Sequence, residues 1–401
     1  MDFVKKTLGD LTIGKGQYGI GASAVDYSED LYTYLRITDI NDDGTLNVNN
    51  LKSINDKNAE RYLLQPNDIV FARTGNSTGR NYFYDGTDGI LVYAGFLIKF
   101  SIDSSKVNPK YIKYYCMSDE YKGWVQGHLT GSTRGNINAQ TYANMEISIP
   151  PREQQNRIVS ILEELERKRK NNIAINRNLL EQMQAIFGSI FYSEMEKGNK
   201  ASLGDYLYIK GRIGWKGLKK EEYLSESEYR IINGESLTVT GIDWNKAGYI
   251  SEERYIESPE IMLQEGDILI SKDGTIGKIG YVNKLDKPTS VASGIFVVRN
   301  LKPEEVSTVF IYCLLNSDYF KSFIASRTEG SVIPHLYQKD FVTLEIPILS
   351  QEQIELFNST VVPLFELFFS NQTENIRLAA LRDSLLPKLM SGELDVSDLD
   401  I

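Results

Sequence analysis

The sequence predicts an α+β protein in which two globular mixed α/β domains are separated by a pair of long antiparallel helices. Two observations carry this prediction. Apolar residues recur at helical spacing over two long stretches, and the chain repeats itself on either side of the first stretch. We expect domains at residues 1–150 and 198–349, the first long helix at 151–197, and the second long helix with an acidic tail at 350–401. The repetition implies pseudo-two-fold symmetry.

The first long helix is expected over Arg152–Met195, where apolar residues three and four positions apart form a stripe on one face. A matching stripe runs through Gln351–Gly392, with Gly392 as the expected C-cap. Two such helices most simply bury their stripes against each other. A helix of this length spans roughly 60 Å, so we interpret the pair as a spacer. Pro363 is expected to kink or interrupt the second helix.

Short sequence matches recur at nearly constant offsets along the chain. Asp68–Arg73 matches Asp267–Lys272 at an offset of 199 residues, and Leu8–Asp10 matches Leu203–Asp205 at an offset of 195. These matches indicate an internal duplication. They lie in framework segments while the intervening loops differ, which suits one scaffold carrying two different recognition loops. Divergence without such a demand would produce the same pattern.

Each half has the same expected order of elements. The apolar runs Asp68–Ala72 and Asp267–Ser271 are bounded by turn residues, as buried strands are. Helical stretches are expected over roughly Pro109–Gly123 and Pro303–Ala325. Alternating apolar residues then predict a half-buried strand that closes each domain.

The composition predicts a folded chain of 401 residues with more than one domain, 41% of it hydrophobic. We find no apolar run long enough to span a membrane and no apolar signal segment at the start, so we expect a cytoplasmic protein. Cys116 and Cys313 are expected to be buried thiols. The few cysteines and histidines lack ligand spacing, so no metal is predicted.

The net charge of −10 argues mildly against a nucleic-acid partner, but much of the excess lies at the end of the chain. Residues 351–401 carry three basic and nine acidic side chains, for which solubility is the simplest role. The sequence contains no phosphate-binding P-loop, no Asn-Pro-Pro-aromatic methyltransferase motif and no nucleophile elbow. Nothing in it predicts an enzyme.

Two equivalent glycine-rich loops follow the matched strands. Arg73–Arg80 contains two guanidiniums, three hydroxyls, an amide and two glycines, and Lys272–Lys278 keeps the order cation, glycine, hydroxyl, glycine, cation. Glycines let backbone N–H groups approach a phosphate or a base edge, while cations, hydroxyls and amides bind phosphates or read bases. The alternative interpretation is a glycine-rich hairpin turn with incidental surface charge.

A second pair of polar loops, Thr130–Asn138 and Glu329–His335, precedes the closing strands, and cations lie beside aromatic residues such as Tyr18 near the start of each domain. No catalytic residue is predicted. The candidate DNA-binding residues are Lys15, Arg73, Thr74, Asn76, Ser77, Thr78, Arg80, Ser132, Thr133, Arg134, Arg212, Lys216, Lys272, Thr275, Lys278 and His335.

Several short motifs occur in a distinctive, duplicated order that spans the whole chain. They are the segments from Asp68 and Asp267, the loops at Gly131-Ser132 and Gly330-Ser331, the transitions Ile149–Ile158 and Ile346–Gln353, and the ending Leu385–Leu394. In these motifs the chain resembles the specificity subunits of type I restriction-modification systems.

This resemblance implies a non-catalytic DNA reader. Each of two target-recognition domains would recognise one half of a split target, and the helices, paired as a coiled coil, would fix the gap. Family members assemble with two copies of a methyltransferase subunit, which carries S-adenosylmethionine, and with a translocating endonuclease subunit. The chain itself would hold no cofactor. Half-sites about one duplex turn apart require surfaces roughly 34 Å apart, which helices of this length can hold.

We therefore expect a sequence-specific DNA-binding subunit that reads a bipartite target and directs a partner methyltransferase and endonuclease to it. The opposed hypothesis is a two-armed protein-interaction scaffold without DNA binding. A glycan or peptide binder ranks last, because the polar loops offer no aromatic platform. Steep salt dependence of duplex binding would separate the first two hypotheses, since phosphate contacts release counterions.

Overall fold

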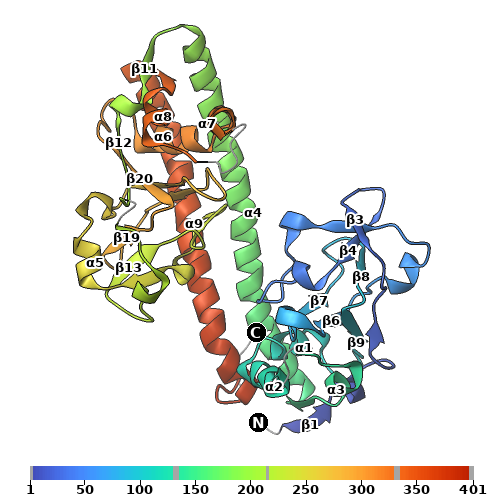
Figure 1. Ribbon diagram of the computed structural model, residues 1–401. Helices are drawn as coiled ribbons and strands as arrows, with labels where there is room; N and C mark the ends of the chain where they lie inside the picture. Colours follow the sequence, from blue (N-terminus) through green and yellow to red (C-terminus); the bar gives the residue numbers. More distant parts are fainter. Residues whose placement is uncertain (1–2, 130–134, 214–215, 329–334, 397–401) are drawn as a thin grey trace. The chain divides into compact units, whose positions relative to one another are not determined.

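The computed structural model describes residues 3–129, 135–213, 216–328 and 335–396. The chain divides into two compact units, residues 1–170 with 375–401, and residues 171–374. The boundary cuts both long helices, so each unit contains one globular domain and one segment of each helix (Figure 1). Both units combine helices with small sheets, which confirms the predicted α+β class.

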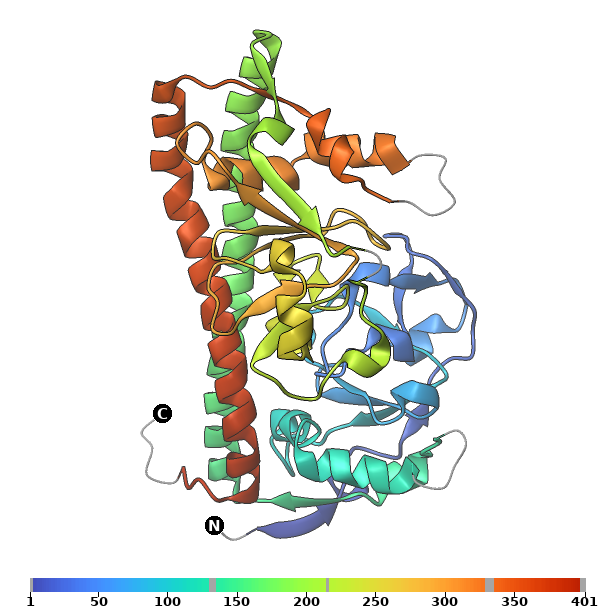
Figure 2. The same ribbon diagram turned by 60° about the vertical axis from the view of Figure 1, so that its left-hand side comes forward.

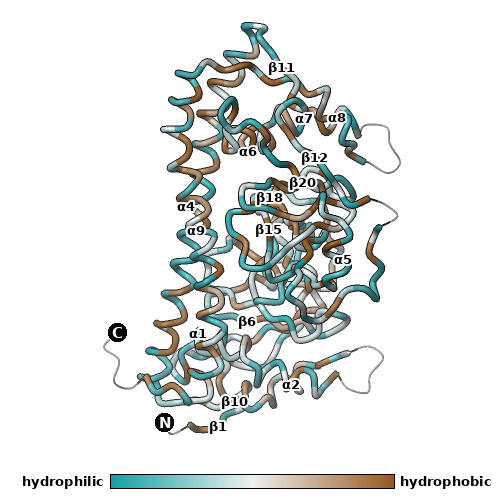
Figure 3. Tube along the Cα trace, turned by 90° about the vertical axis from the view of Figure 1, so that its left-hand side faces the viewer, coloured by the Kyte–Doolittle hydropathy of each residue, from teal (hydrophilic) through white to brown (hydrophobic). Residues whose placement is uncertain are grey.

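The two long helices are α4 (Arg152–Glu196) and α9 (Gln351–Ser391), close to the predicted bounds. Apolar and polar residues alternate along both of them (Figure 3). Within the second unit they run antiparallel. Gln353 donates to Glu194 (2.5 Å) at one end of the paired segment, and Asn371 donates to Asn176 (2.9 Å) towards the other. Gly392 follows α9 with a φ of 77°, as a left-handed C-terminal glycine does.

The predicted interruption at Pro363 is wrong, because α9 is one continuous helix through this residue. Proline removes the N–H that would bond to the carbonyl of Ser359. Both residues are exposed, so water can satisfy that carbonyl.

The first domain contains three small sheets, and its predicted closing strand pairs with the N-terminal strand in one of them. The sheets are β1 (Val4–Thr7) with β10 (Glu146–Ile149); β2 (Gln17–Tyr18), β9 (Leu97–Ser101), β6 (Asp68–Ala72) and β7 (Asn81–Tyr84) in that order; and β3 (Ala24–Asp26), β5 (Lys52–Ile54), β4 (Tyr32–Leu35) and β8 (Leu91–Tyr93) in that order. In the last sheet β4 and β8 are parallel, whereas the other pairs are antiparallel.

The second domain repeats this arrangement. Its sheets are β11 (Lys200–Ser202) with β21 (Glu345–Pro347); β12 (Leu207–Gly211), β20 (Ile295–Asn300), β17 (Ile268–Ser271) and β18 (Ile279–Tyr281) in that order; β16 (Gly248–Ile250), β13 (Tyr229–Ile232) and β19 (Thr289–Val291); and β14 (Leu237–Thr238) with β15 (Gly241–Ile242). Here β13 and β19 form the parallel pair. The shared strand order supports the inferred duplication.

Short helices complete both domains. They are α1 (Pro109–Tyr115), α2 (Asp119–Leu129) and α3 (Ala139–Ala143) in the first, and α5 (Glu252–Ile256), α6 (Thr308–Asn316), α7 (Asp318–Thr328) and α8 (Gln338–Val342) in the second. Each predicted helical stretch is thus divided into two. The break falls at Ser118 and at Ser317, whose hydroxyls bond the backbone on both sides of the break.

A buried carboxylate occupies the same framework position in both domains. Asp68 and Asp267 are each 1% exposed, at the start of the matched strands. Asp68 accepts from the Gln65 N–H (2.8 Å) and pairs with Lys99 (3.2 Å). Asp267 accepts from the Gln264 N–H (2.7 Å) and pairs with Arg299 (2.7 Å). A buried charge requires such partners, which explains why the aspartate recurs with them.

Each domain packs its helices onto both long helices of its own unit. In the second unit α6 lies beside both long helices (Figure 2). The ring of its Phe310 is 4.9 Å from that of Phe187 in α4 and 5.2 Å from that of Phe357 in α9. In the first unit one apolar core contains Tyr111 of α1, Leu162 of α4 and Leu389 of α9. The predicted stripes are therefore buried against the domains as well as against each other.

Both cysteines are buried free thiols, as predicted. Burial raises the pKa of the Cys313 thiol to about 12 and that of Cys116 further still. Across the described helices, none is both long and apolar enough to cross a membrane.

Candidate nucleic-acid interface

The predicted glycine-rich loops connect the two matched strands to their neighbours in the sheet. In the first domain the loop leaves β6 at Arg73 and enters β7 after Arg80, whose carbonyl accepts from the N–H of Ala72 (2.8 Å). Gly75 and Gly79 have φ values of 75° and 90°, a backbone conformation that favours glycine. In the second domain the N–H of Ser271 donates to Lys278 in the same way (3.0 Å).

The backbone holds the first cation of each loop identically. The N–H of Arg73 donates to Phe96 (3.0 Å), and its carbonyl accepts from Ile137 (2.9 Å). The N–H of Lys272 donates to Gly294 (2.9 Å), and its carbonyl accepts from Leu336 (3.1 Å). Ile137 lies within the first loop of the second predicted pair, and Leu336 directly follows the second loop of that pair. The fold thus brings the two loop pairs together, once in each domain.

Each of these cations lies over an aromatic ring. The guanidinium carbon of Arg73 is 5.1 Å from the ring centroid of Tyr18, and Nζ of Lys272 is 5.1 Å from that of Phe296. Arg73 is half-buried, and its Nε has no hydrogen-bond partner among the described residues. Tyr18 is 42% exposed, and its hydroxyl accepts from the N–H of Ala139 (3.2 Å).

The remaining loop residues of the first domain differ in what they can offer a ligand. Asn76 is exposed, and Thr74 and Ser77 are half-buried. Thr78 is buried, and its hydroxyl donates to the carbonyls of Gly75 (2.7 Å) and Gly135 (3.2 Å), so it supports the loop from within.

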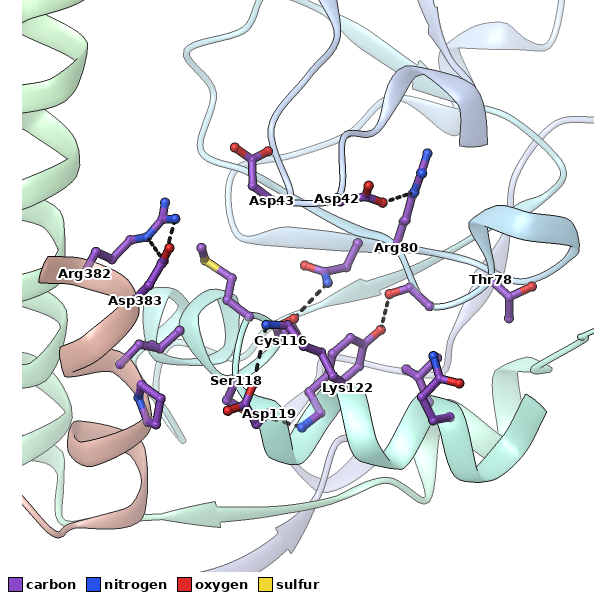
Figure 4. A pocket seen from close by; sticks show the side chains of 18 residues that line it. Asp42, Asp43, Thr78, Arg80, Cys116, Ser118, Asp119, Lys122, Arg382 and Asp383 are labelled. Carbon is purple, nitrogen blue, oxygen red and sulfur yellow. Dashed lines mark hydrogen bonds and ion pairs between the residues drawn. The ribbon is translucent and has the colours of Figure 1, made fainter. Parts of the chain in front are cut away.

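Arg80 is already paired inside its domain. Its Nε lies 2.7 Å from the carboxylate of Asp42, and its Nη1 donates to the carbonyl of Ile40 (3.2 Å). Figure 4 shows both Arg80 and Asp42 at a pocket of about 640 Å³. We therefore leave Arg80 and Thr78 out of the proposed interface.

The pocket in Figure 4 lies in the first unit, between the loop that carries Asp42, helix α2 and the end of α9. Three cations line it, and each pairs with a carboxylate that also lines it. The pairs are Arg80–Asp42 (2.7 Å), Lys122–Asp119 (3.5 Å) and Arg382–Asp383 (2.7 Å). Its cationic charge is thus balanced locally, which does not favour an anion site.

In the second domain Thr275 is exposed, while Lys278 donates to the carbonyl of Gly234 (3.2 Å). His335 contacts the carboxylate of Asp273 through Nδ1, and its ring centroid lies 4.5 Å from that of Tyr337. Asp273 follows Lys272 directly, so a carboxylate and an imidazole flank this cation.

The candidates near the start of each domain have different surroundings. Lys15 is exposed. Arg212 lies inside the second domain at 2% exposure, where it donates to Val291 (3.1 Å) and Ser258 (3.3 Å), and burial lowers its pKa. Lys216 donates to the carbonyl of Glu257 (2.5 Å). We leave Arg212 out of the interface as a structural group. Ser132, Thr133 and Arg134 lie outside the described residues.

The structure adds exposed residues beside Arg73 that the sequence did not single out. Phe96 is 56% exposed, and Asn136 is exposed and bridges to Thr74. Tyr18, an aromatic neighbour of Lys15 in the sequence, contacts Arg73 in the fold. Among the described residues, no cluster of three His, Cys, Asp or Glu side chains could hold a metal ion.

Comparison with known proteins decides the family. The model of the type I restriction modification DNA specificity domain matches residues 1–182 and 195–355. The chain belongs to this family. Each matched segment contains one complete copy of the strand, loop and ring-held cation described above.

Members of the specificity family resemble the chain over most of its length. The type I restriction enzyme MjaIX specificity subunit of Methanocaldococcus jannaschii is 26% identical over 316 residues, covering 74% of this chain and 72% of the relative. The HindI specificity subunit of Haemophilus influenzae is 21% identical and covers 94% and 99%. The crystal structure of a type I restriction-modification S subunit from M. genitalium has a TM-score of 0.56 at 19% identity and covers 97% and 96%. This likeness to the solved structure shows a similar fold.

Proposed function

We propose that this protein is a sequence-specific DNA-binding subunit that reads a bipartite target. The observation that carries the proposal is the duplicated, ring-held cation at the end of a buried strand, in a chain that belongs to a DNA specificity family. Each domain reads one half-site with its own cation and its own neighbouring loops. The pair α4–α9 acts as a coiled-coil spacer that fixes the gap between the half-sites.

Methylation and cleavage belong to partner subunits in this proposal. Two copies of a methyltransferase subunit, which would carry S-adenosylmethionine, and a translocating endonuclease subunit are brought to the target by this chain. Large apolar side chains on the outer faces of the long helices support a docking role. Leu356 is 61% exposed, Ile173 57% and Leu367 47% in the second unit, and Ile376 and Leu381 are exposed in the first.

The same exposed apolar residues favour a second candidate, a two-armed scaffold that binds proteins and not DNA. The net charge of −10 fits that candidate too. The two differ in how binding to duplex responds to salt, since a chain that neutralises phosphates releases counterions and loses affinity steeply as salt rises.

Selection from a library of random duplexes tests the proposal. The full-length chain, alone and with its methyltransferase partner, is incubated with the library, and bound duplexes are sequenced. We expect two enriched blocks of defined sequence separated by a gap of fixed length. Binding without enrichment, and without a steep loss of affinity between low and moderate salt, would favour the scaffold.

A further inference from the structure

We propose that Arg73 and Lys272 are equivalent phosphate anchors, one for each half-site, and that base choice lies with their unlike neighbours. This inference rests on the proposed function and divides the work within each recognition site. Contacts to phosphate position a protein on the duplex, whereas contacts to base edges specify sequence.

The first step of the argument is the shared backbone. Arg73 and Lys272 directly follow equivalent strands. Equivalent segments fix each of them through one hydrogen bond from its N–H and one to its carbonyl. The duplication has therefore kept the place of this residue in the two domains. The rest of the two loops that contain these cations has diverged in sequence.

The second step is the aromatic ring. In each domain the cation lies 5.1 Å from a ring centroid, but the ring comes from a different strand. Tyr18 belongs to the edge strand β2, whereas Phe296 belongs to the inner strand β20. Space for the Phe296 ring is left by its register partner Gly211, where a Cβ would come within 3.2 Å of it. Unrelated residues thus provide the same support for the cation.

The third step is the exchange of arginine for lysine. Arginine presents a rigid planar fork of donors, whereas lysine is a compact point charge on a flexible stem, so the two are not interchangeable where a fixed donor geometry is required. A phosphate accepts either cation. What the two positions share is a positive charge held against a ring, so the common task is charge neutralisation. The cation–π attraction also holds the side chain of the cation against the ring, which restricts its rotamers.

The neighbours of the two cations are chemically different. Thr74 and the exposed Asn136 lie beside Arg73, whereas the paired Asp273 and His335 lie beside Lys272. Amides and hydroxyls offer both donors and acceptors to base edges, and a carboxylate accepts from the amino group of cytosine. Different base preferences in the two half-sites follow from these neighbours.

The test measures affinity of the full-length chain for its selected target and for an unrelated duplex over a series of salt concentrations. We expect Arg73→Ala and Lys272→Ala each to reduce the affinity for both duplexes by the same factor. Each should also make the plot of log K against log salt less steep by about 1. Arg73→Lys and Lys272→Arg should retain the target preference and the slope. Lys122→Ala removes a surface cation of the first domain that pairs with Asp119, and it is the control.

A base-reading role gives a different pattern. Loss of preference at the first half-site in Arg73→Lys, or unchanged affinity for unrelated duplex in Arg73→Ala, would overturn the inference while leaving the proposed function intact. If the unsubstituted chain showed no salt-dependent duplex binding, either alone or with its methyltransferase partner, both the inference and the proposed function would be overturned. Two variants test the ring. Tyr18→Phe should bind both duplexes as the parent does, whereas Tyr18→Leu should reduce the affinity for both duplexes equally. The thermal unfolding temperature of Tyr18→Leu should be unchanged.

Discussion

Two arginines of one loop, Arg73 and Arg80, differ in the partners that the fold gives them. Arg73 lies against a ring, whereas Arg80 is neutralised by Asp42 at 2.7 Å. The sequence predicted both as DNA-binding because it shows residue types and spacing. It does not show that Asp42, from a distant segment, reaches Arg80. The rings under Arg73 and Lys272 could not be predicted from the duplication, since they occupy non-equivalent strands.

The pairing of Arg80 gives a residue-scale prediction. Asp42→Asn releases the guanidinium from its carboxylate and adds one unbalanced positive charge to the loop. We expect higher affinity for duplex at low salt and a salt slope that is steeper by up to about 1. Filter binding over a salt series measures both. Asp119→Asn makes the same change of charge at the Lys122 pair and should have a smaller effect. Equal effects of the two variants would show a general effect of net charge and no specific effect of the guanidinium released in this loop.

The duplicated buried aspartate gives a second prediction at this scale. Asp267→Ala leaves the guanidinium of Arg299 without its partner and the Gln264 N–H without an acceptor. We expect a loss of roughly 3 kcal/mol in the free energy of unfolding, as for a broken buried pair, and a similar loss in Asp68→Ala. Urea unfolding measures it. Asp26→Ala, in an exposed pair with Lys52, should be close to neutral. Near-neutral values for the buried sites would contradict this account.

At the scale of elements, prediction succeeded where the signal is local. The bounds of α4 and α9 follow from a repeating stripe, and Gly392 ends α9 as expected. The breaks at Ser118 and Ser317 did not follow from periodicity, because a single capping hydroxyl divides an otherwise continuous pattern. The parallel pairs β4–β8 and β13–β19 were not predicted either, since they join strands far apart in the chain.

The seam between α4 and α9 contains a polar layer in the second unit. Asn371 donates to the side-chain oxygen of Asn176 (2.9 Å), and Asn176 donates to the carbonyl of Phe368 (2.9 Å). Both asparagines are 8% exposed. Asn172 of α4 donates to Glu374 of α9 beside them (2.8 Å). Such buried amides are satisfied only when the helices are aligned in this way, so the layer helps to fix their alignment.

This layer gives the element-scale prediction. Asn176→Leu and Asn371→Leu each leave a buried amide without a partner and should cost about 1–3 kcal/mol of unfolding free energy. The double variant, in which two apolar groups meet, should lose less than the sum of the two. Urea unfolding of the parent, the two single variants and the double variant gives the coupling free energy between the two side chains. Strictly additive losses would show that the two side chains do not act as a pair. Asn171→Leu, on the exposed face of α4, is the control.

At the scale of the whole molecule, the chain is two related units that share two continuous helices. The duplication predicted this organisation from the sequence, because the matched motifs recur in the same order. It could not supply the bases that each domain reads. Those depend on the geometry of unlike loops and on DNA shape, neither of which a motif encodes.

The central claim is that the domains read the two half-sites and the helices set the distance between them. It is tested most directly by inserting one heptad into each helix, after Lys170 in α4 and after Glu374 in α9, and repeating the selection from random duplexes. Seven residues lengthen a helix by about 10 Å, or roughly three base pairs. We predict a gap longer by about three base pairs between two unchanged half-site sequences. Altered half-site sequences, or an unchanged gap, would contradict the account.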